Sequence, residues 1–116
     1  MRLVAATLLA ALLIGLPALA QAAGFVSVAE DVPLMPGLTE KPGAVVFDKP
    51  DGRIVEVDAA GAVQRQRVEE FYAAALPQLG WARDAQGAFA RENERLSLSF
   101  TGRDGQLVVH IAIAPH

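Results

Sequence analysis

The chain has 116 residues, of which 53% are hydrophobic, and it carries 10 Lys and Arg against 13 Asp and Glu, a net charge of -3. An acidic chain without a long basic cluster does not present the surface that binds nucleic acid or anionic lipid. The sequence contains no cysteine, which excludes disulfides, thiolate metal sites, a cysteine nucleophile and the lipidated cysteine of bacterial lipoproteins.

Residues 1–22 follow the order of a secretion signal. Arg2 is the only charged residue, the stretch 3–16 has no ionisable side chain, and small residues follow it. This apolar run is shorter than the roughly 20 residues that span a bilayer. We therefore expect cleavage after Ala22, or alternatively after Ala20, and a periplasmic or secreted bacterial protein without a stable membrane anchor.

The next segment, residues 23–43, is predicted to be a proline-rich extended arm. Pro33, Pro36 and Pro42 interrupt it, and prolines at this density prevent a helix and restrict strands to sheet edges. Its apolar residues are expected either to pack on the chain's own domain or to bind a partner. Residues 44–116 are predicted to form one α+β domain with a modest core.

Two apolar runs at 44–49 and 53–58 predict a β-hairpin. Pro50-Asp51-Gly52 separates them, with Pro suited to the first bend of a turn and Gly to a left-handed position. A three-residue loop gives the hairpin one apolar face. The pairs that it predicts are Phe47 with Val55 and Val45 with Val57.

The strongest pattern in the chain predicts an amphipathic helix between Val63 and Leu79. Six apolar residues recur at helical spacing and form one stripe. Gly80 supplies a helix stop, and Trp81 is expected to begin the next strand. The stripe consists of Val68, Phe71, Tyr72, Ala75, Leu76 and Leu79.

The C-terminal third alternates between apolar and polar residues and predicts a strand meander. Two-residue loops at Glu92-Asn93 and Arg103-Asp104 put the large apolar residues on one face. The predicted pairs are Phe89 with Leu96, Phe100 with Leu107, Leu98 with Val109 and Leu96 with Ile111. The fold class predicted from all elements is α+β, with one amphipathic helix packed on an antiparallel sheet of about five strands in ββαβββ order.

His110 is the candidate for chemistry near neutral pH. The predicted register places it opposite Ser97 on the open side of the sheet, and an imidazole beside a hydroxyl is the start of a hydrolase-type site. However, Ser97 has no strained turn to expose it, and no acid is placed to orient the imidazole. A surface histidine is therefore the preferred interpretation.

The other charged groups are interpreted as solvated pairs. Glu69 and Glu70 lie with arginines on the predicted solvent-exposed face of the helix, and Arg91 and Glu94 flank a turn. Nothing in the sequence matches a phosphate loop, a metal-ligand series or a nucleotide-binding motif. No catalytic, metal-binding or cofactor-binding residue is assigned, and no cofactor is expected.

Two motifs resemble those of small exported bacterial domains, many of which are lipoproteins. The first is the Asp-x-Pro-x-x-Pro-Gly opening at residues 31–37, and the second is Phe71-Tyr72 followed by Leu76-Pro77-Gln78-Leu79-Gly80-Trp81. The likeness spans roughly residues 31–113, and the chain departs from the lipoprotein members because it lacks their lipidated cysteine. The resemblance implies no defined activity.

The sequence thus favours a non-enzymatic binding or accessory protein of the cell envelope. It is expected to meet an envelope protein or a small ligand through the arm or the open sheet face. The alternative is a hydrolase-type enzyme with a site near His110 and Ser97. A third hypothesis is a structural protein that self-associates through an uncovered sheet edge.

Overall fold

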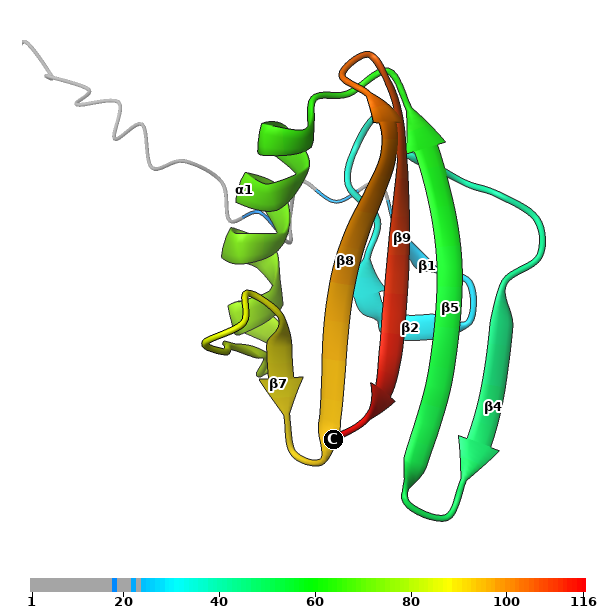
Figure 1. Ribbon diagram of the computed structural model, residues 1–116, viewed down its shortest axis with the longest axis vertical. Helices are drawn as coiled ribbons and strands as arrows, with labels where there is room; N and C mark the ends of the chain where they lie inside the picture. The colour runs from blue at the N-terminus through cyan, green and yellow to red at the C-terminus, as the bar shows by residue number, and fades with distance from the viewer. Residues whose placement is uncertain (1–17, 19–21, 23) are drawn as a thin grey trace, which may run out of the picture.

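The structure, a computed structural model, describes residue 18, residue 22 and residues 24–116. The predicted secretion signal lies outside this part of the chain except for Ala18 and Ala22, and the alternative cleavage position Ala20 lies outside it as well. Figure 1 shows a tall, twisted sheet with one helix standing beside it. No helix in the described residues is long and apolar enough to cross a membrane.

Most strands belong to one antiparallel sheet of seven strands. Its order is β3-β5-β9-β8-β7-β6, and β4 also pairs with β5, on the side of β5 away from β9. A separate sheet contains β1 and β2. The strands are β1 (Phe25–Val26), β2 (Ala29–Pro33), β3 (Thr39–Glu40), β4 (Val45–Lys49), β5 (Gly52–Gly61), β6 (Ala82–Arg83), β7 (Phe89–Arg91), β8 (Glu94–Arg103) and β9 (Gln106–Pro115).

The chain is α+β, but the predicted sheet of about five strands in ββαβββ order is wrong. The described residues form nine strands in two sheets, and β1, β2 and β3 precede the predicted hairpin. Strands β1, β3 and β6 have two residues each and β7 has three, which is too short for an alternating pattern to show in the sequence. The prolines of the arm also obscured β2, which ends at Pro33.

The predicted helix is present as α1 (Arg65–Ala75), continued by the 3-10 helix η2 (Leu76–Leu79). The tighter helix starts where Pro77 removes a backbone donor. Gly80 then ends it in the left-handed conformation, as the sequence predicted. In the stripe, Val68, Tyr72, Ala75 and Leu76 are buried, and Phe71 and Leu79 pack at the margin of the core.

The hydrophobic core lies between α1 and one face of the large sheet. Alternate residues of β5 and β9 point into it, because side chains on a strand alternate between faces. The two-stranded sheet closes the same core and lies behind β5 and β9 in Figure 1. The arm contributes the buried residues Val26, Ala29, Val32 and Leu38. Segment 24–43 therefore shares one core with the long strands.

The β4–β5 hairpin differs from its predicted register by one residue. Val46 pairs with Val55 and Phe47 pairs with Ile54, because the loop consists of Pro50-Asp51 alone. A slip of one residue moves every side chain to the other face, so Phe47 leaves the core side for the open face, the side of the sheet that α1 does not cover. Strand β4 lies at the sheet edge with little to bury, so no apolar face fixed its register.

The β8–β9 hairpin differs from its predicted register by two residues, whereas β7 and β8 pair as predicted, with Phe89 opposite Leu96. The turn lies at Asp104-Gly105, a dipeptide favoured in two-residue hairpin loops. A shift of two residues keeps every side chain on its face, so the apolar pattern could not distinguish the two registers. The observed pairs are Phe100 with Val109, Leu98 with Ile111 and Leu96 with Ile113.

Candidate functional site

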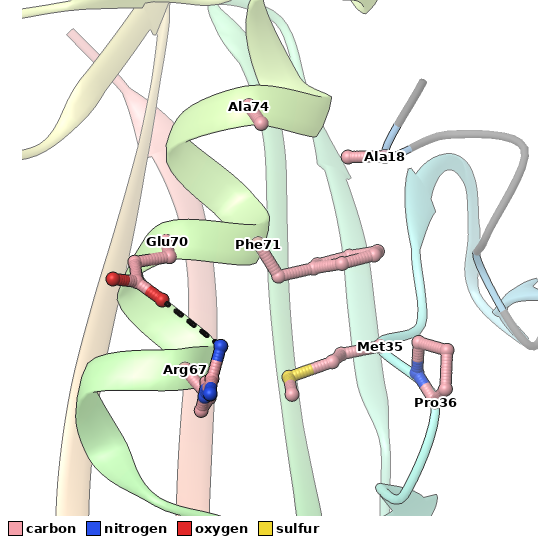
Figure 2. Close-up of a pocket in the computed structure, with 7 residues that line it drawn as sticks. All are labelled: Ala18, Met35, Pro36, Arg67, Glu70, Phe71 and Ala74. Carbon is pink, nitrogen blue, oxygen red and sulfur yellow. Dashed lines mark ion pairs between the residues drawn. The ribbon is translucent and has the colours of Figure 1, made fainter. Parts of the chain in front are cut away.

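A groove between the arm and the helix is the candidate binding site of the described chain. It has a volume of about 390 Å³. The loop after β2 forms one side, and α1 forms the other (Figure 2). The lining residues are Ala18, Met35, Pro36, Arg67, Glu70, Phe71 and Ala74.

Phe71 is the large apolar side chain that α1 contributes to the groove. In Figure 2 its ring extends from the helix toward the arm, between Ala18 and Met35. The ring stands edge-on to Tyr72, with centroids 5.0 Å apart and an interplanar angle of 86°. This is a favoured aromatic geometry, so the neighbouring core residue fixes the orientation of the Phe71 ring.

Tyr72 fixes the arm side of the groove. Its hydroxyl donates a hydrogen bond to the carbonyl oxygen of Pro33 at 2.8 Å. Burial raises the pKa of Tyr72 to about 12, so the hydroxyl remains a donor at neutral pH. On the other side of the loop, the N–H of Leu38 donates to the carbonyl oxygen of Met35 at 3.1 Å. The wall formed by Met35 and Pro36 is therefore held on both sides.

Two charged residues of α1 form the polar rim of the groove. Arg67 and Glu70 approach to 3.8 Å, and their side chains are 72% and 56% exposed. An exposed ion pair of this kind contributes little to stability. Both side chains can therefore turn toward a bound chain at small cost to the fold.

Ala18, a residue of the predicted secretion signal, also lines the groove. Figure 2 shows its side chain directed toward the helix. A small apolar residue from a segment that precedes the folded core thus lies at the site. Cleavage at the expected position, after Ala22, would remove this residue from the lining of the groove.

The two residues of the hydrolase alternative are not cross-strand partners. His110 pairs with Ser99 on β8, whereas Ser97 pairs with Ala112. The predicted pairing of His110 with Ser97 is wrong because it followed from the β8–β9 register that is shifted by two residues.

His110 is held instead by two carboxylates of β5. Its Nδ1 lies 2.6 Å from Oδ1 of Asp58, and its Nε2 lies 3.2 Å from Oε1 of Glu56. Sequence reasoning missed these acids because Asp58 and His110 are 52 positions apart. The available signal was the alternation Glu56-Val57-Asp58, which places both acids on one face of a strand. Since both ring nitrogens face carboxylates, neither is directed at a serine hydroxyl.

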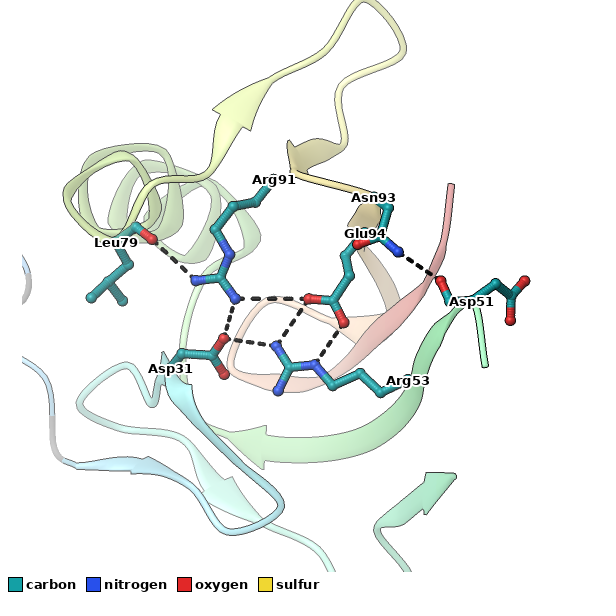
Figure 3. A network of polar contacts seen from close by, with 7 residues as sticks. All are labelled: Asp31, Asp51, Arg53, Leu79, Arg91, Asn93 and Glu94. Carbon is teal, nitrogen blue, oxygen red and sulfur yellow. Dashed lines mark hydrogen bonds and ion pairs between the residues drawn. The ribbon is translucent and has the colours of Figure 1, made fainter. Parts of the chain in front are cut away.

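Four charged side chains form a network where the arm meets the large sheet (Figure 3). Arg53 donates to Oδ2 of Asp31 at 2.7 Å and to Oε2 of Glu94 at 2.8 Å. Arg91 also donates to Asp31. Burial alone would raise the pKa of Asp31, but the hydrogen bonds from Arg53 and Arg91 outweigh it and lower the pKa from 3.8 to about 2.

The interpretation of Arg91 and Glu94 as solvated turn residues is wrong. Their side chains are only 23% and 14% exposed. The guanidinium of Arg91 stacks on Trp81, 4.3 Å from the ring centroid, and donates to the carbonyl oxygen of Leu79 at 3.1 Å. The network therefore ties the arm and the end of the helix to the sheet. Its two acids pair with its two arginines, while Oδ1 of Asp31 is buried without a hydrogen-bond partner in the described part of the chain.

No family model matches this chain. No curated protein and no solved structure matches it either.

The groove, the histidine and the charged network differ in what they can bind. The network is occupied by its own ion pairs, and the hollow beside His110 is small, about 190 Å³. No group of three or more His, Asp and Glu side chains in the described residues has the arrangement of a metal site. The groove combines an apolar lining with an exposed charged rim, which is the composition of a site for an apolar side chain of another chain.

Proposed function

We propose that the chain is a non-enzymatic binding protein of the cell envelope. It is exported by residues 1–22 and then holds a short apolar segment of an envelope protein in the groove between the arm and α1. Arg67 and Glu70 at the rim contact polar groups that flank the bound segment.

The observation that carries this proposal is the position of Ala18. It comes from the most apolar part of the sequence and lies at a groove formed by Met35, Phe71 and Ala74. An apolar residue of the leader thus forms part of the wall of the groove beside Met35 and Phe71, and an apolar residue of another chain can take that place after the leader is removed. Met35 adds adaptability, because an unbranched thioether side chain fits varied apolar partners.

The size of the groove limits the kind of ligand. With Ala18 as part of its lining, the groove has a volume of about 390 Å³, which is near the lower end of ligand pockets and suits one or two apolar side chains of a peptide. The groove is therefore expected to anchor one segment of a larger partner. An isolated peptide with the same segment is expected to bind weakly.

The test uses a labelled peptide of residues 14–22, Ile-Gly-Leu-Pro-Ala-Leu-Ala-Gln-Ala, added to the chain that lacks residues 1–22. Ala74 lines the groove and is exposed, so Ala74→Glu places a charge in the site with little cost to packing. Ala73 is the matched control, because it is exposed on the same helix and does not line the groove. Fluorescence anisotropy measures the affinity.

We expect Ala74→Glu to weaken peptide binding about tenfold or more, corresponding to about 1.4 kcal/mol, and Ala73→Glu to change it less than twofold. Capture from periplasmic extract with the same two variants then identifies the partner as a protein retained by Ala73→Glu and lost with Ala74→Glu. Absence of peptide binding, or equal binding by the two variants, would refute the proposed site.

A further inference from the structure

Strand β4 exposes three consecutive large apolar residues at the edge of the sheet. Val45 is 36% exposed, Val46 is 46% exposed and Phe47 is 61% exposed. Figure 1 shows β4 as the outermost strand beside β5. Soluble proteins usually protect such an edge with charges, proline or a covering segment, because its open backbone groups pair readily with another strand.

The free backbone groups of β4 can be identified from one hydrogen bond on the same side of β5. The N–H of Lys41 donates to the carbonyl oxygen of Asp58 at 2.8 Å, so Asp58 directs its backbone groups toward the edge where β3 and β4 lie. Backbone direction alternates along a strand, so Glu56, Ile54 and Gly52 of β5 also point toward this edge. Their backbone groups therefore hydrogen-bond to their partners on β4, which are Val45, Phe47 and Lys49. Val46 and Asp48 therefore direct their N–H and C=O groups away from β5.

We infer that a second copy of this chain covers the edge by pairing its own β4 with this one in antiparallel orientation. The two-fold axis passes beside Phe47, so that Phe47 faces Phe47 of the second copy. Val46 and Asp48 exchange backbone hydrogen bonds with Asp48 and Val46 of the second copy. This register overlaps all five residues of β4 and joins the two sheets into one.

The central residue of β4 is complementary to itself in this register, while Val46 faces Asp48 of the second copy. The two Phe47 side chains form a non-hydrogen-bonded pair, in which cross-strand side chains lie closest. Lys49 faces Val45 of the second copy, beyond which lies Glu56 of β5, so a cation and an acid share one row. Moving the axis one residue toward the loop, a register shift of two residues, would set Asp48 against Asp48, which is unfavourable, and moving it one residue the other way would replace the Phe47 pair by Val46 against Val46.

The pairing is expected to be weak. One five-residue strand on each side buries less than the about 1,600 Å² of a standard interface, so the dimer depends on concentration. This inference does not rest on the proposed function, because no residue of β4 lines the groove.

Sedimentation equilibrium of the chain purified from the producing cells, between about 10 µM and 1 mM, tests the association. Val46→Pro removes an outward N–H and is compatible with an edge strand, whereas Val46→Thr keeps both the N–H and the branched side chain. We expect Val46→Pro to weaken dimerisation at least about tenfold and Val46→Thr to change it less than about threefold. A chain that stays monomeric throughout, or equal association of two folded variants, would overturn the inference.

A second experiment tests the register even where Val46→Pro fails to fold. The chain has no cysteine, so Phe47→Cys and Lys49→Cys each create one thiol on the same face of β4. On the axis, the Cα atoms at position 47 lie about 4.5 Å apart, within the range of a disulfide, whereas the two copies of position 49 lie about 14 Å apart. Under mild oxidation the Phe47→Cys chain should form disulfide-linked dimers at least tenfold faster. Equal rates would exclude this pairing.

Discussion

Asp31 joins the arm to two strands that lie far from it in the sequence. It accepts hydrogen bonds from Arg53, 22 positions away, and from Arg91, 60 positions away. The sequence identifies Asp31 as part of a motif at residues 31–37, but its partners depend on tertiary contacts that no local pattern encodes. The same limit applies to His110, whose carboxylate partners lie on another strand.

Replacing Asp31 by Asn is expected to lower the free energy of unfolding at neutral pH by about 2 kcal/mol, because two guanidiniums lose their shared carboxylate. The pKa of Asp31 falls from 3.8 to about 2 on folding, so the folded state binds its proton less readily than the unfolded state. This contribution is present above about pH 5 and is lost as the pH falls toward 2. Urea unfolding should show that the free energy of unfolding decreases less between pH 7 and pH 3 in Asp31→Asn than in the unmodified chain.

Glu69→Gln is the control for this prediction. Glu69 lies 3.5 Å from Arg65, and both side chains are about half exposed. Its removal should cost less than about 0.5 kcal/mol, because solvent screens exposed pairs. If Asp31→Asn costs no more than Glu69→Gln, the network does not stabilise the fold.

Elements of secondary structure were predictable where their residues form a long pattern. The stripe of α1 and the pairing of Phe89 with Leu96 on β7 and β8 both follow from apolar periodicity. The predicted registers were wrong where that periodicity carries no information. These places are the exposed edge strand β4 and the β8–β9 hairpin, in which a shift of two residues keeps the same faces. In both hairpins the residues that form the loop determine the register. The sequence allows more than one loop in each hairpin, and the structure shows that the loops are Pro50-Asp51 and Asp104-Gly105.

Gly61 at the end of β5 allows the loop of the arm to approach the sheet. A Cβ atom at Gly61 would lie 2.0 Å from the carbonyl oxygen of Gly37, which only a backbone shift can relieve. Gly61→Ala is therefore expected to cost at least about 2 kcal/mol of unfolding free energy and to loosen residues 34–40. Hydrogen exchange should show at least tenfold faster exchange of the amides of β3.

Gly105→Ala is the control for this prediction, because it introduces backbone strain without a steric clash. Gly105 has φ +88 but nothing lies within 4 Å of a Cβ atom there. The substitution should cost about 1 kcal/mol and leave exchange in β3 unchanged. Unchanged β3 exchange in Gly61→Ala as well would mean that the close approach does not hold the arm.

The whole molecule depends on the arm more than its proline-rich sequence indicates. Composition separates residues 23–43 from 44–116, but the structure places Val26, Val32 and Leu38 in the common core, each less than 5% exposed. Burial of such side chains contributes about 1.5–3 kcal/mol each. Their sum is comparable to the about 5–15 kcal/mol that stabilises a small domain.

Deleting residues 24–43 is therefore expected to abolish cooperative folding. The deletion also removes Asp31 from the charged network and the carbonyl acceptor of Tyr72, so a buried hydroxyl and two guanidiniums lose partners. Thermal unfolding followed by circular dichroism should show no cooperative transition, whereas deletion of residues 1–22 should leave it intact. A cooperative transition in the shorter chain would instead show that the long strands and α1 fold alone, and that the arm is a separable wall of the groove.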